Sequence, residues 1–142
     1  MESRVSELVP AANDQNSHKV INIDATLLKT LSQIGYMACM KGMPNEGEMI
    51  MESLTGLKPQ TPPIVLGLAF AKITLMKFTD AEKLIREVLA NDANNLTAKC
   101  FLGITLFGLG DREQANVYFA DIQANGNEDQ KAIAVAYMSV EE

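Results

Sequence analysis

The chain has 142 residues, a length that suits one domain whose core can fold without a disulfide or a structural metal. Its 12 basic and 18 acidic side chains give a net charge of −6, which disfavours contact with nucleic acid or anionic lipid. Hydrophobic residues make up 47% of the chain but never form the run of about 20 that a membrane-spanning helix needs. We therefore expect a protein that neither binds nucleic acid nor inserts into a membrane.

Residues 1–23 are predicted to be a flexible polar tail, and residues 24–142 a single helical domain. The tail has no regular apolar spacing, and it contains Pro10 and the chain's one histidine, His18. It also lacks the basic start and the apolar stretch of a secretion signal, so we expect the protein to stay in the cytoplasm.

From residue 24 onward the apolar pattern repeats every 34 residues, in units that begin at Leu28, Pro62 and Leu96. This is the length of a tetratricopeptide unit, in which two antiparallel helices form a hairpin. We predict an all-α fold of three such repeats and a C-terminal capping helix, wound into a short right-handed superhelix without strands. The expected helices cover residues 25–41, 45–56, 63–76, 79–91, 96–109, 112–124 and 128–139.

Small residues indicate where the two helices of each predicted hairpin touch, because they let two helix backbones approach closely. Large apolar residues follow on each second helix at the three-to-four spacing of a buried stripe, and they form the predicted core. The small residues are Gly35, Ala69 and Gly103 on the first helices and Gly47, Ala81 and Ala115 on the second, and the core residues are Met51, Leu54, Ile85, Val88, Phe119 and Ile122.

The second repeat fits the pattern least well. Lys72 occupies a position that normally holds a large apolar or aromatic residue. An array of helical hairpins with accidental spacing is therefore an alternative interpretation.

The segment from residue 128 is predicted to cap the stack, since the last repeat would otherwise expose its apolar stacking face. Its apolar side is expected to consist of Ala132, Ile133, Ala136 and Tyr137.

Stacked repeats of this type curl so that their first helices line a concave surface. The lining predicted here is almost wholly apolar, which suits the apolar face of an amphipathic partner helix. Alternatively, the protein's own C-terminal helix or a second copy covers it. The predicted groove residues are Tyr36, Cys39, Met40, Leu66, Phe70, Ile73, Cys100, Ile104 and Phe107.

Catalytic, metal-binding and cofactor-binding patterns are not found in the sequence. A single histidine cannot supply a multi-histidine metal site, and it lies in the polar tail, away from any candidate triad. Cys39 and Cys100 lack CxxC spacing and lie in apolar stretches, so we predict two free, buried thiols. Gly42 and Gly110 are typical of turns rather than of a phosphate-binding loop. We predict a protein that is not an enzyme and uses no cofactor.

Four stretches of the repeat region resemble the small tetratricopeptide proteins of bacterial type III secretion systems. They are GYMACMKG in the first repeat, the LKP break after it, PPIVLGLAFA in the second repeat and AKCFLGITLFGLGD in the third. The resemblance covers about residues 31–115. It implies a cytosolic bacterial chaperone that binds a protein before its secretion, in some cases beside a second small helical chaperone.

Within this family, the resemblance favours the chaperones of the needle subunit, a protein that polymerises through an amphipathic C-terminal helix. A groove that covers the apolar face of that helix would prevent premature assembly. The alternatives are a chaperone of hydrophobic translocator proteins, which usually has a helical N-terminal dimerisation segment, and a scaffold subunit of a larger assembly. The residues implied to face the cargo are Tyr36, Met40, Leu66, Phe70, Ile73, Ile104 and Phe107.

Overall fold

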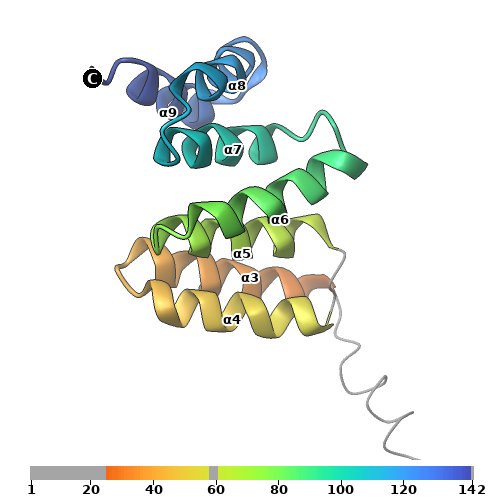
Figure 1. The fold of residues 1–142 in the computed structure, drawn as a ribbon. Coiled ribbons are helices and arrows are strands. Elements are labelled where there is room, and N and C mark those ends of the chain that lie inside the picture. Colours follow the sequence, from red (N-terminus) through yellow and green to blue (C-terminus); the bar gives the residue numbers. More distant parts are fainter. Residues whose placement is uncertain (1–24, 58–60, 142) are drawn as a thin grey trace, which may run out of the picture.

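The computed structural model describes residues 25–57 and 61–141, and within these ranges all regular structure is helical (Figure 1). The predicted all-α fold is confirmed, and each helix lies within about two residues of its expected position. The helices are α3 (Ala25–Met40), α4 (Pro44–Leu57), α5 (Pro62–Thr74), α6 (Phe78–Asn91), α7 (Leu96–Gly108), α8 (Arg112–Asn125) and α9 (Glu128–Met138). The predicted tail, with Pro10 and His18, lies outside the described residues.

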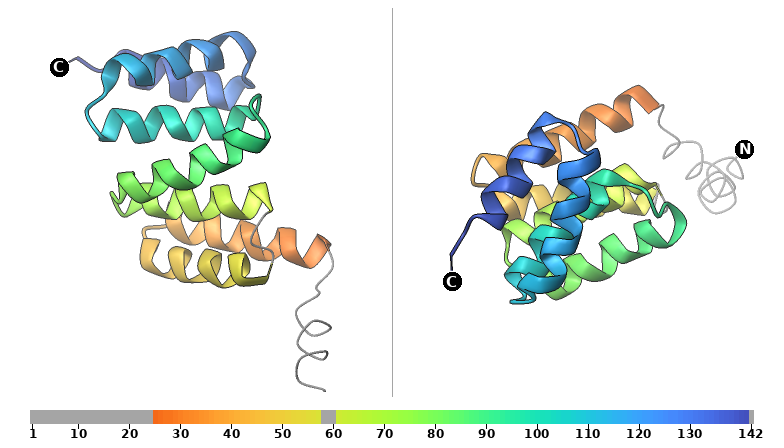
Figure 2. Two further views of the ribbon diagram at one scale, coloured as in Figure 1. Left: turned by 45° about the vertical axis from the view of Figure 1, so that its right-hand side comes forward. Right: turned by 90° about the horizontal axis from the view of Figure 1, so that it is seen from above.

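The helices form three antiparallel hairpins, and the hairpins stack on one another (Figures 1 and 2). Helix α3 contacts α5, α5 contacts α7, and α7 contacts α9. The backbones of α4, α6 and α8, all within the described part of the chain, make no such contact with one another. The first helices of the hairpins are therefore closer together than the second helices. This difference curves the stack and places α3, α5 and α7 on its concave side.

Close contact between the helices of a hairpin depends on the predicted small residues, all of which are buried. A Cβ atom on Gly47 would overlap Sγ of Cys39 and lie 3.0 Å from the carbonyl oxygen of Gly35. A Cβ atom on Gly103 would lie 2.6 Å from a ring carbon of Phe119. The side chain of the facing helix thus occupies the space that each glycine leaves.

The apolar core consists of two clusters. The smaller one joins α4 to α5 through Met51, Leu54, Ile64 and Leu68. The larger one extends from α5 to α9, and the partly buried Leu84 packs against both clusters. All six predicted core residues are buried, with exposed fractions between 0% and 5%: Met51, Leu54, Ile85, Val88, Phe119 and Ile122.

Turns and caps end the helices where the sequence indicates. Gly42 and Gly110 have φ angles of 82° and 88°, a region that a glycine adopts without the cost of a Cβ atom. Asn127 begins α9 with a capping box, because its side chain accepts a hydrogen bond from the backbone N–H of Gln130, 2.8 Å away, and the Gln130 side chain accepts one in return.

Helix α9 caps the stack, and the predicted side is confirmed in part, because Ile133 and Tyr137 pack against the larger core cluster. Ala134 is fully buried, whereas Ala132 and Ala136 are exposed. Tyr137 packs its ring 5.4 Å from that of Phe119, and this contact fixes the rotation of the helix. The buried stripe therefore includes Ala134, at the i+3 spacing to Tyr137.

Lys72 is tolerated at its normally apolar position because it forms an ion pair. Its ammonium lies 2.5 Å from a carboxylate oxygen of Glu48 on α4, and the two side chains are only 15% and 13% exposed. Lys77 approaches the same carboxylate at 3.1 Å. The first and second repeats are thus joined by a charged contact as well as an apolar one.

Replacing Gly103 with alanine should lower the free energy of unfolding by about 1–3 kcal/mol, because the new Cβ would overlap the fully buried Phe119 ring. Gly56 is the matched control, since it is also helical and a Cβ added there would meet no neighbouring atom within 4 Å. Gly56→Ala should stabilise the protein by about 0.4–1 kcal/mol. Urea denaturation followed by circular dichroism measures both, and equal stabilities would contradict the packing role of Gly103.

The Glu48 carboxylate should make stability depend on pH. Its pKa is lowered, chiefly by the hydrogen bond from Lys72. Its contribution is therefore present above the unfolded-state pKa of about 4.3 and is lost as the pH falls through the lower folded-state pKa. Glu48→Gln should cost about 1–3 kcal/mol of unfolding free energy at pH 7, and this difference should shrink as the pH falls below about 4. The exposed Glu87 provides the control for loss of a surface carboxylate, since Glu87→Gln should change the free energy of unfolding at pH 7 by less than about 0.5 kcal/mol.

Candidate partner-binding groove

Three aromatic side chains form a continuous row across the concave surface, one from each inner helix. The ring of Tyr36 on α3 lies 5.4 Å from that of Phe70 on α5, measured between centroids. The Phe70 ring in turn lies 5.5 Å from that of Phe101 on α7. All three side chains are partly exposed, so they offer a connected apolar surface that spans three hairpins.

The structure brings most of the predicted groove residues to this side of the stack but buries three of them. Cys39, Leu66 and Cys100 are only 2–6% exposed and belong beneath the surface. Met40, by contrast, is 68% exposed. The remaining predicted residues are partly exposed: Tyr36, Phe70, Ile73, Ile104 and Phe107.

The prediction for the three buried residues is therefore corrected, and helix geometry gives the reason. Cys39 points toward α4, where its sulfur fills the space left by Gly47. Cys100 lies in the larger core cluster, and the next residue, Phe101, is turned about 100° further around the helix and faces the groove. Phe101 is missing from the predicted groove because its neighbour Cys100 was expected to occupy that side of the helix.

A 34-residue comparison of the repeats gives no signal for Phe101, because neither earlier residue at its position is aromatic. The corresponding residues of the earlier repeats are Gln33 and Gly67. A Cβ on Gly67 would overlap the methyl carbon of Met51 and lie 3.3 Å from a ring carbon of Tyr36, so the missing side chain leaves room chiefly for Met51. The absence of a side chain at Gly67 thus lets Met51 and Tyr36 of the first hairpin pack closely against α5.

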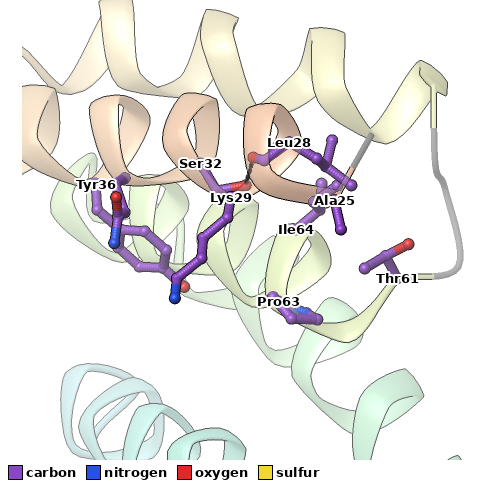
Figure 3. Close-up of a pocket in the computed structure, with 9 residues that line it drawn as sticks. Ala25, Leu28, Lys29, Ser32, Tyr36, Thr61, Pro63 and Ile64 are labelled. Carbon is purple, nitrogen blue, oxygen red and sulfur yellow. Dashed lines mark hydrogen bonds between the residues drawn. The ribbon is translucent and has the colours of Figure 1, made fainter. Parts of the chain in front are cut away.

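An apolar pocket of about 430 Å³ lies beside Tyr36 at the N-terminal end of the groove (Figure 3). Its walls come from α3 and from the start of α5, with Leu28 and Tyr36 on one side and Pro63 and Ile64 on the other. The Ser32 hydroxyl donates a hydrogen bond to the carbonyl oxygen of Leu28 at 2.9 Å. The pocket therefore has the size and chemistry to accept an apolar side chain.

The C-terminal end of the concave face is covered by the protein itself. Tyr137 of α9 packs edge-on against the ring of Phe107 at 5.0 Å. The guanidinium of Arg112 lies 5.4 Å from the centre of the same ring. The alternative that the C-terminal helix covers the groove thus applies at Phe107. The row from Tyr36 to Phe101, by contrast, stays partly exposed among the described residues.

Burial keeps the ionisable groups of this region neutral. It raises the pKa of Tyr36 to about 12, with a smaller contribution from Cys39. It also raises the pKa of Cys100 to about 11 and, as the largest cause, raises that of Cys39. Both cysteines are free and buried, as predicted, so the thiols remain protonated near neutral pH and poorly nucleophilic.

The thiols should react slowly in the folded protein. We expect the rate of iodoacetamide labelling at pH 7 to be lower by roughly 100-fold or more than in guanidinium chloride, because the thiolate is scarce and local opening must precede reaction. Mass spectrometry of labelled peptides reports each cysteine separately. Rapid labelling of Cys100 in the native protein would contradict its position beneath the groove.

None of the helices in the described part of the chain is long and apolar enough to cross a membrane.

Comparison with known proteins identifies a matching family and a similar solved structure. Residues 18–141 match the family model described as bacterial type III secretion protein (HrpB1_HrpK). No curated protein matches the sequence. A similar fold is found in the crystal structure of the Yersinia enterocolitica type III secretion translocator chaperone SycD in an alternative dimer, with a TM-score of 0.65 and 15% sequence identity. The similarity covers 82% of this chain and 96% of that one.

Proposed function

Because this chain belongs to the HrpB1_HrpK family of bacterial type III secretion proteins, we propose that it acts as a cytoplasmic chaperone for a secreted protein. In this proposal it has no catalytic role and uses no cofactor. The observation that carries the proposal is the aromatic row from Tyr36 through Phe70 to Phe101, which leads to the apolar pocket beside α3.

The groove would bind its partner by burying apolar surface. Aromatic side chains contribute large contact areas at a low cost in conformational entropy, and a pocket at one end fixes the register of the bound segment. A secreted protein that exposes apolar segments before export would otherwise aggregate or assemble early. Occupation of those segments by the groove is the proposed chaperone mechanism.

Two classes of cargo fit a groove of this chemistry. The sequence resemblance favoured the amphipathic helix of a needle subunit. The fold is also that of a translocator chaperone, which supports a hydrophobic translocator protein at least as well, so we place this cargo first. Co-expression of the chain with each cargo from its own secretion system, followed by affinity capture, distinguishes them, since only the true cargo should remain soluble and bound.

Phe70→Glu should abolish partner capture, because a carboxylate at the centre of the row would be buried without a counter-charge when the partner binds. The expected loss is about 2–4 kcal/mol of binding free energy. The fold should survive, since Phe70 is partly exposed in the free protein. Ile85→Glu is the contrasting variant: Ile85 is fully buried and the same change there should unfold the chain.

Thermal melting and affinity capture of both variants test the proposal together. If Phe70→Glu unfolds as Ile85→Glu does, the milder Phe70→Ala variant replaces it in the capture experiment. A folded Phe70 variant that captures the cargo as well as the wild type does would refute the groove model.

A further inference from the structure

The pocket beside Tyr36 lies next to the point where the chain enters the described structure. Ala25, the first residue of α3, lines the pocket together with Ile64 of α5 (Figure 3). The Ser32 hydroxyl also lies in the wall, but it already donates a hydrogen bond to the backbone of Leu28. An occupant of this pocket therefore has to supply apolar surface rather than a polar partner.

The four residues at positions 20–23 have the composition of such an occupant. This entry segment reads Val-Ile-Asn-Ile, so three of its four side chains are apolar and β-branched. Only Asp24 separates it from Ala25, so its second residue is within about 14 Å of Ala25 even along an extended chain. The family match begins at residue 18 and includes the whole entry segment.

The start of α3 directs the entry segment toward the pocket. Asp24 is of a residue type that is favoured at the N-cap, the position just before a helix. The residue before an N-cap often packs on the fourth residue of the helix, in a contact called the hydrophobic staple. Here that pair is Ile23 and Leu28, and Leu28 lines the pocket.

We propose that the entry segment folds back along α3 and occupies this pocket in the free protein. Two residues of extended chain advance about 6.6 Å, which equals the rise of about four helical residues. With Ile23 on Leu28, Ile21 therefore reaches Ser32. The two isoleucine side chains face the pocket together and Asn22 faces solvent, because side chains alternate along an extended segment.

Occupancy of the pocket by the entry segment regulates the groove, and this consequence rests on the proposed function. A cargo side chain enters the pocket only after the entry segment has left it. The segment is tethered beside the pocket and so competes at a high effective concentration. A partner that binds only weakly along the aromatic row is therefore excluded from the pocket.

A disulfide equilibrium tests the proposal without any cargo. The full chain carries Ile21→Cys with either Ser32→Cys or Thr30→Cys, and a glutathione buffer reports the effective concentration of each thiol pair. Ser32 lines the pocket and is 8% exposed, whereas Thr30 is exposed, lies outside the pocket lining and is nearer in sequence. The proposal predicts a value about tenfold or more higher for the Ser32 pair, whereas the tether alone would favour the Thr30 pair.

Two further substitutions in the Ser32 pair separate packing of the entry segment from its tether. Ile23→Asp removes the apolar contact with Leu28 and should lower the effective concentration by about tenfold. Asn22→Asp is the matched control, because it adds the same charge on the solvent side and should change the value by less than about twofold. Peptide mapping identifies the bonded cysteines, and circular dichroism confirms that each variant is folded.

Three outcomes of this experiment would overturn the proposal. They are a Thr30 pair that equals or exceeds the Ser32 pair, an Ile23→Asp variant that keeps the full value, and a disulfide that joins two chains instead of closing within one. The opposite results, with a bond inside a single chain, would support it.

Affinity for a co-expressed translocator protein of the same secretion system tests the regulatory consequence. Ile21→Asp empties the pocket and should raise this affinity by about threefold or more, because the tethered competitor is lost. An unchanged affinity would overturn the competition. Absence of binding by both the wild type and the variant would instead refute the chaperone function, while the disulfide equilibrium still decides what occupies the pocket.

Discussion

The close approach of two helices across a pair of small residues is the constraint on which this structure depends. At Gly47 the opposing sulfur already occupies the volume of a side chain, and at Gly103 the Phe119 ring does so. These contacts set the distance between the helices of each hairpin. The stack of hairpins is curved because the inner helices α3, α5 and α7 touch their neighbours, whereas the backbones of the outer helices α4, α6 and α8 do not approach one another in this way.

The groove follows from that curvature rather than from any special loop. Three inner helices held at close spacing bring Tyr36, Phe70 and Phe101 within ring-to-ring contact, although they are separated by more than thirty residues along the chain. A repeated hairpin therefore needs only one apolar substitution per repeat to build an extended binding surface. Because the surface comes from helices, it is already formed before a partner arrives, which reduces the entropy cost of binding.

The fold was predictable from the sequence because the 34-residue period, the small residues and the apolar stripes all indicate the same hairpin. The groove was predictable only in outline. A helix turns about 100° per residue, so an error of one position exchanges Cys100 for Phe101 and the core for the surface. Lys72 gave a misleading signal for a different reason: its partner Glu48 lies on another helix, and no local pattern reveals a pairing across 24 residues. The rotation of α9 likewise depends on a contact between Tyr137 and Phe119 that periodicity alone does not specify.

The division of the core into two clusters bears on how cooperatively the two ends of the molecule unfold, and the aromatic row spans that division. In a linear stack, cooperativity is transmitted only between neighbouring units, so a weak junction lets one end open while the other stays folded. The smaller cluster holds the α4–α5 junction, while the larger one extends from α5 to α9. Phe101 packs on the larger cluster, and Tyr36 stands on the first hairpin, outside it. In the proposed function, a segment bound along the row would bridge this junction, so that the two ends of the molecule would open and close together.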